Sequence, residues 1–213
     1  MKFSNYYIKL NVRFFFVLIM TLWIIVLLCL NNTIYSKDIF LNIFSDYYAS
    51  DQIMDYLLIA KRNIYWVLTI NLMIVFAHIV SMSILLYLIS YMNNVRIRVV
   101  DCVNLSLKAE VIFIVQILSK IIELKCFFIP DNSLELAIIP FSILKIMNYS
   151  YFEPWLFFAI NYFNIFELFY ILFISYLYSR FIGIGLFKSF NMLSYGYLSM
   201  LILYILIVIL LLI

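Results

Sequence analysis

The chain of 213 residues is 68% hydrophobic and only 12% charged, a balance that excludes an ordinary soluble domain and predicts a multi-pass membrane protein. Its net charge of +3 is dispersed over short segments, which excludes the clustered basic face that nucleic-acid binding requires. Glycine and proline number three each, and no linker is visible. We therefore expect one membrane domain over residues 1–213, with the lipid bilayer as a partner, together with other membrane proteins or further copies of the chain.

Five segments are long and apolar enough to cross a bilayer, since a membrane helix needs about 20 mainly apolar residues. They cover about 14–30, 64–92, 105–129, 155–178 and 192–213. The second exceeds the bilayer thickness and must tilt or project, and the third is the least hydrophobic. The sequence predicts an all-α fold, a bundle of about five transmembrane helices.

The positive charges in the flanks of these segments predict an orientation, because cytoplasmic loops carry more Lys and Arg than outer loops. If the N-terminus is cytoplasmic, the inner flanks hold eight such residues and the outer loops five. The inner set is Lys2, Lys9, Arg13, Arg96, Arg98, Lys108, Arg180 and Lys188, and the outer set is Lys37, Lys61, Arg62, Lys125 and Lys145. We expect an N-in/C-out topology.

The first outer loop contains a helical pattern, "SDQIMDYLLIAKR". Ser50 is a plausible N-cap with Asp51 in the first turn, and Ile53, Leu57 and Leu58 recur at helical spacing. We expect a short interfacial helix on the membrane surface, with Leu57 on its lipid side.

The second outer loop holds all three prolines of the chain, Pro130, Pro140 and Pro154, which interrupt regular helix there. Its interior is nevertheless apolar. We expect this loop to dip into the membrane interface or to pack on the bundle.

Two of the predicted spans carry a polar stripe. On the fourth, Asn161, Asn164 and Glu167 are spaced by three residues, and Ser175 and Tyr178 share their side of a helix. On the third, a similar arc holds Lys108, Gln116, Ser119, Lys120 and Glu123, whereas Glu110 lies outside it near the cytoplasmic end. Because an ionised group facing lipid costs at least about 2.5–3.5 kcal/mol, the two stripes should face each other or a wet cavity.

Depth in the membrane suggests which groups pair. Glu167 lies near the midpoint of the fourth span, His78 near that of the second and Lys120 near that of the third. This predicts a Lys120–Glu167 pair with His78 as a third member, and Glu123 as the competing partner of Lys120 at i, i+3. The full predicted polar cluster is Glu167, Lys120, His78, Asn164, Asn161, Glu123 and Gln116.

Such a cluster has two interpretations that the sequence leaves open. It can fix the register of packed helices, or it can serve a proton- or ion-linked pathway that uses Glu167 and His78. Signatures of catalysis are missing from the sequence: a single histidine excludes an H-E-x-x-H zinc site, no G-x-S-x-G is present, and Gly183 and Gly185 lack the setting of a phosphate-binding loop. We expect a non-enzymatic protein without catalytic residues, cofactor or metal.

The C-terminal half resembles a known family. The succession of "AEVIFIVQILSKIIE", "IIPFSILKIMN" and "FNIFELFYILFISYLY", followed by a last span after a short basic loop, looks like the Yip1-type membrane domain over roughly 105–213. In that family a P-[LF]-S element precedes a span that opens with N-[IL]-F, and the matching positions here are Pro140, Ser142, Asn164 and Phe166. The resemblance implies five spans with a cytoplasmic N-terminus.

The expected function follows from this resemblance and from the missing catalytic motifs. We expect a Yip1-like protein in membrane organisation, or a partner of other membrane proteins. The alternatives are a small transporter or permease subunit with a polar pathway past Glu167 and an accessory subunit of a large membrane complex. The expected location is the cytoplasmic membrane of a bacterium, or an endomembrane or organelle membrane otherwise.

Overall fold

The computed structural model describes residues 12–127, 129–147 and 152–212, and within these ranges the chain is all-helical and forms no strand. Among the described residues, four helices are long and apolar enough to cross a membrane. They are α1 (Val12–Ile34), α4 (Ile64–Met92), α9 (Ile165–Ile182) and α10 (Leu186–Leu212). This arrangement is that of a membrane-embedded protein.

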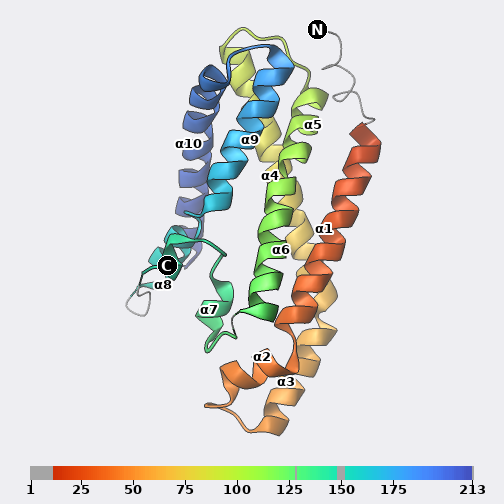
Figure 1. Ribbon diagram of the computed structural model, residues 1–213, viewed down its shortest axis with the longest axis vertical. Helices are drawn as coiled ribbons and strands as arrows, with labels where there is room; N and C mark the ends of the chain where they lie inside the picture. The colour runs from red at the N-terminus through yellow and green to blue at the C-terminus, as the bar shows by residue number, and fades with distance from the viewer. Residues whose placement is uncertain (1–11, 128, 148–151, 213) are drawn as a thin grey trace.

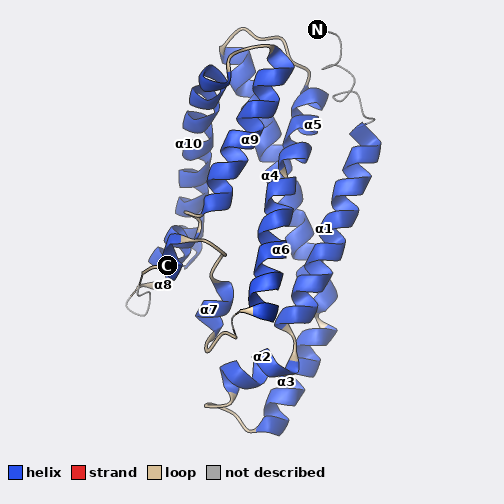
Figure 2. Cartoon of the chain, in the orientation of Figure 1, coloured by secondary structure: helices blue, strands red, loops and turns tan. Residues whose placement is uncertain are grey.

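A fifth rod runs beside these four helices. It consists of α5 (Val99–Ala109) and α6 (Val111–Cys126), which stack end to end between α1 and α9 (Figure 1). The turns α4–α5 and α9–α10 lie at the same end of the bundle as the start of α1. The short helices α2 (Lys37–Phe44), α3 (Ser50–Arg62) and α7 (Ser133–Ala137) lie toward the opposite end (Figure 2).

Two apolar clusters hold the rods together. The larger lies among α4, α5, α9 and α10 and includes Met82, Leu86 and Ile174, all fully buried. The second, around Ile19 and Ile79, joins α1 to α4, α5 and α6. Most other large side chains of the long helices point outward, as expected for helices whose remaining surface faces lipid.

The bounds of α4 agree with the predicted span 64–92, but the predicted span 105–129 differs from the structure. The rod begins at Val99 and is interrupted at Glu110, a single residue between α5 and α6. Glu110 keeps a helical conformation, with φ −57° and ψ −20°. The earlier start matters because it moves Glu110 from the end of a span into the interior of the rod.

The predicted continuous span 155–178 is wrong. The chain forms α8 (Pro154–Asn161) and then starts α9 anew at Ile165. Asn164 is extended, with φ −131°, and its Oδ1 accepts the backbone N–H groups of Phe166 and Glu167. The extended N-cap residue separates α8 from α9, and its side chain accepts backbone N–H groups that have no partner within the first turn of a helix. Glu167 therefore lies in the first turn of α9 and not at the midpoint of a span.

The helix predicted in the first outer loop is present as α3, with the predicted bounds. Its N-cap is Ala49 rather than Ser50, and the backbone N–H of Ala49 donates to the Gln52 side chain. Leu57 is 3% exposed and Leu58 is 63% exposed, so the prediction that Leu57 faces lipid is wrong. The buried face of α3 packs on the protein, chiefly on α2. A location on the membrane surface stays a prediction.

Candidate functional site

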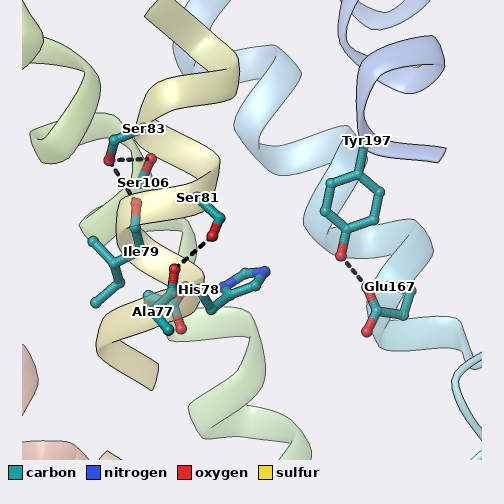
Figure 3. Close-up of polar contacts among 9 residues, drawn as sticks. Ala77, His78, Ile79, Ser81, Ser83, Ser106, Glu167 and Tyr197 are labelled. Atoms are coloured by element: carbon teal, nitrogen blue, oxygen red, sulfur yellow. Dashed lines mark hydrogen bonds and ion pairs between the residues drawn. The ribbon is translucent and has the colours of Figure 1, made fainter. Parts of the chain in front are cut away.

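A hydrogen bond between a histidine and a buried carboxyl group connects α4 to the junction of α5 and α6. His78 Nδ1 lies 2.7 Å from Glu110 Oε1, and the Glu110 side chain is 1% exposed. Close by, Ser83 of α4 donates its hydroxyl to Ser106 of α5 at 3.2 Å (Figure 3). Two polar contacts thus join α4 to α5 and to the α5–α6 junction, close to the buried carboxyl group of Glu110.

A second acidic contact joins α9 to α10. Tyr197, 2% exposed, donates its hydroxyl to Glu167 Oε2. Figure 3 shows that the His78 ring points from α4 toward the side on which Glu167 and Tyr197 lie. His78 therefore faces the region of Glu167, but its hydrogen-bond partner is Glu110.

Tyr170 of α9 lies between these two contacts. Its ring centroid is 5.3 Å from that of His78 and 5.5 Å from that of Tyr197, and the ring stacks on Phe113 at 4.7 Å. The side chain is fully buried, and its hydroxyl has no hydrogen-bond partner among the described residues. We call His78, Glu110, Tyr170, Glu167 and Tyr197 the core polar cluster.

The predicted Lys120–Glu167 pair is wrong. Lys120, 8% exposed, donates from Nζ to the backbone carbonyl of Ile138 at 2.7 Å. Glu123, the predicted competitor for Lys120, instead forms an ion pair with Lys145 in the short turn Ile143–Lys145. Burial lowers the pKa of Lys145, which lies in this loop outside the long helices. Both α6 side chains hold the second outer loop, so that loop packs on the bundle.

The predicted asparagines serve the same loop. Asn161 donates to the carbonyl of Ala137 and accepts from the N–H of Ile139, each at 2.9 Å. Asn164 caps α9, and its backbone forms an antiparallel bridge with Ser142. We call Lys120, Glu123, Asn161 and Asn164 the loop anchor. Gln116, the last residue of the predicted cluster, is half-buried and makes no side-chain hydrogen bond to the described residues.

The two short motifs that carry the family resemblance lie side by side. Ser142 bridges Asn164, and the ring of Phe141 lies 6.1 Å from that of Phe166. Phe141 has φ +56°, a left-handed conformation that non-glycine residues adopt at a cost. The loop and the start of α9 therefore form one local unit, and Glu167 lies in the first turn of the helix that begins there.

An open pocket lies elsewhere, at the end of the bundle formed by α1, α2 and α6. Its volume is about 450 Å³, and its lining includes Thr33, Asp38 and Lys125. None of its lining residues belongs to the core polar cluster. The cluster is packed inside the bundle and does not open on this pocket.

Of the predicted residues, the structure brings His78 and Glu167 into one region, and it adds three that the sequence analysis missed. Glu110 lies outside the polar arc by helical spacing, and the predicted span start at 105 puts it near the end of a span, whereas the rod begins at Val99. Tyr170 follows Glu167 by three residues and so lies on its side of the helix, a spacing that could have indicated it. Nothing in the sequence around Tyr197 indicates its contact.

Comparison of the chain with known protein families, with curated proteins and with solved structures finds no match. The fold and the site define a helical protein of the membrane-embedded class with a buried polar cluster. Any narrower function has to be argued from the geometry.

Proposed function

We propose that the chain crosses the membrane five times, with the stacked pair α5–α6 as the third crossing. The support is that this rod runs beside the four long apolar helices over most of their length (Figure 1). Both ends of the rod carry charged residues, Arg98 and Asp101 at one and Lys125 at the other. An N-in/C-out orientation then follows from the positive charges of the flanks, two of which, Lys2 and Lys9, lie outside the described residues.

The function that the geometry supports best is non-enzymatic: a Yip1-like role in membrane organisation or as a partner of other membrane proteins. One observation carries it. The carboxyl, lysine and histidine side chains that the bundle buries among the described residues have partners inside the protein, in the contacts His78–Glu110, Glu167–Tyr197, Lys120–Ile138 and Glu123–Lys145. What remains for outside partners is an apolar helical surface, which suits lipid and transmembrane helices.

A second candidate is a small transporter or permease subunit with a polar pathway past Glu167. The observation that favours it is the core polar cluster, since ionisable groups inside a membrane bundle commonly belong to ion or proton pathways. Close packing of the cluster argues against an open conduit in the conformation described.

The experiment that separates the two candidates combines crosslinking with a flux assay. A photo-crosslinking amino acid replaces Leu203, 60% exposed on α10, and in a control variant replaces the fully buried Met82. The partner role predicts that the variant with the crosslinker at position 203, and not the control at position 82, forms a discrete protein adduct in native membranes. The same adduct should form when the purified partner is added in proteoliposomes. The partner role is refuted if position 203 captures only lipid while proteoliposomes show a pH-driven flux that Glu167→Gln abolishes.

A further inference from the structure

The core polar cluster has an unbalanced set of charges. It contains two carboxyl groups, Glu110 and Glu167, and one basic side chain, His78. Lys120, the lysine of the predicted cluster, donates instead to the Ile138 carbonyl. If His78 is protonated and both carboxyl groups are ionised, the cluster carries one net negative charge.

Apolar and aromatic surroundings make that net charge costly. The titratable side chains of the cluster come from four elements: His78 from α4, Glu110 from the α5–α6 junction, Glu167 and Tyr170 from α9, and Tyr197 from α10. A hydroxyl pair, Tyr162 with Tyr204 at 2.9 Å, adds only neutral groups beside Glu167. An uncompensated charge at membrane depth costs several kcal/mol, and one additional proton removes it.

The contacts indicate where that proton resides. Glu110 faces the imidazole of His78, a partner that stabilises an ionised carboxylate. Glu167 faces the hydroxyl of Tyr197, a neutral group that can donate to a carboxyl oxygen or accept from a protonated one. Glu110 therefore has a basic partner and Glu167 a neutral one, so we assign the additional proton to Glu167.

We propose that the core polar cluster is a proton-binding site in which Glu167 holds one exchangeable proton in the folded protein at neutral pH. Release breaks the O–H bond of the Glu167 carboxylic acid, leaves a carboxylate and transfers the proton to water. Tyr170 lies between Tyr197 and His78, and its hydroxyl has no hydrogen-bond partner among the described residues. Because a hydroxyl can both donate and accept a hydrogen bond, it can pass a proton between Glu167 and Glu110.

Proton release is coupled to helix packing. Glu167 and Tyr170 belong to α9 and Tyr197 to α10, whereas His78 and Glu110 belong to α4 and the α5–α6 rod. A carboxylate at Glu167 adds repulsion toward Glu110 across this contact and so weakens the packing of α9 on α4 and α5–α6. The site thereby links a proton to the conformation of the bundle, which goes beyond a partner-binding role.

Infrared difference spectroscopy of the full chain in nanodiscs tests the site. We expect a carbonyl band of a protonated carboxylic acid at pH 7 that shifts in D₂O, that is lost in Glu167→Gln and that persists in Glu123→Gln. The control replaces a largely buried acid, Glu123, whose partner is Lys145 and which lies outside the core polar cluster. The assignment is overturned if the folded protein has no such band, or if Glu110→Gln removes the band and Glu167→Gln does not.

A second measurement stays decisive if Glu167→Gln fails to fold. Unfolding of the unsubstituted chain at pH 7 should release nearly two protons, one from Glu167 and most of one from a protonated His78, because the ordinary pKa of histidine, about 6.5, lies below this pH. The release is read with a pH indicator in weak buffer. Because the folded state then binds more protons than the unfolded state, the ratio of folded to unfolded protein should fall by up to about a hundredfold per pH unit as the pH rises. Release of one proton or less, or proton uptake, contradicts the proposal.

Discussion

The replacement Lys120→Met tests the loop anchor. Lys120 Nζ donates to the Ile138 carbonyl at 2.7 Å in a site where the side chain is 8% exposed. Methionine keeps the length and the apolar stem but removes the donor, so the carbonyl loses its partner. An unpaired buried acceptor costs about 1–3 kcal/mol, which corresponds to a 5–150-fold change in the unfolding equilibrium.

Lys125→Met is the matched control, because Lys125 lies on the same helix and its side chain is exposed. Its expected effect stays within about 0.5 kcal/mol, as for most surface substitutions. The assay is unfolding of the purified chain in mixed micelles, followed by circular dichroism. Equal stability of the two variants would contradict the anchoring role of Lys120.

Combination with Glu167→Gln separates the loop anchor from the core polar cluster. Lys120 and Glu167 have no common partner among the described residues, so the losses of stability should add to within about 0.3–0.5 kcal/mol. A coupling energy above about 1 kcal/mol in the double-mutant cycle would restore the direct pair that the sequence predicts and refute the arrangement described here.

Three further predictions concern other parts of the fold. Asn164→Ala should destabilise the chain by about 0.5–2 kcal/mol in thermal unfolding, whereas Asn164→Ser, which keeps a capping oxygen, should lose less; equal losses would exclude the cap. A Cβ at Gly196 would lie 2.9 Å from a Leu85 methyl group, too close unless that methyl shifts, which the end of a flexible side chain can do; Gly196→Ala should therefore be nearly neutral, and Gly196→Leu should cost about 1–3 kcal/mol in the same assay. A reporter active only in the cytoplasm should work after Met92 or near Gly183 and fail at the C-terminus, and activity there would remove the five-crossing topology.

The sequence predicts well those parts of the fold that depend on local pattern. The run 64–92 is mainly apolar, contains no Asp, Glu, Lys or Arg, and is followed by Asn93 and Asn94, so α4 has the predicted bounds. The helix at Ser50–Arg62 was likewise predicted from its spacing of apolar residues. In both cases the deciding information lies within the segment itself.

The break before α9 was missed because one spacing has two meanings. Asn164 and Glu167, three residues apart, were interpreted as one face of a continuous helix, but the same spacing is that of an N-cap and the third helical residue. Apolar residues on both sides hid the boundary. The partner of Lys120 could not be predicted at all, because a backbone carbonyl such as that of Ile138 has no sequence signature and depends on how the loop folds back.

The loop anchor and the core polar cluster meet at the start of α9. Asn164 belongs to the anchor and accepts the N–H of Glu167, the acidic member of the cluster, with its side chain. The backbone bridge from Ser142 to Asn164 ties that cap to the loop that Lys120 and Glu123 hold on α6. The polar residues that the sequence suggested as one ion-paired cluster thus form two groups that adjoin at the N-cap of α9, with Lys120 in one group and Glu167 in the other.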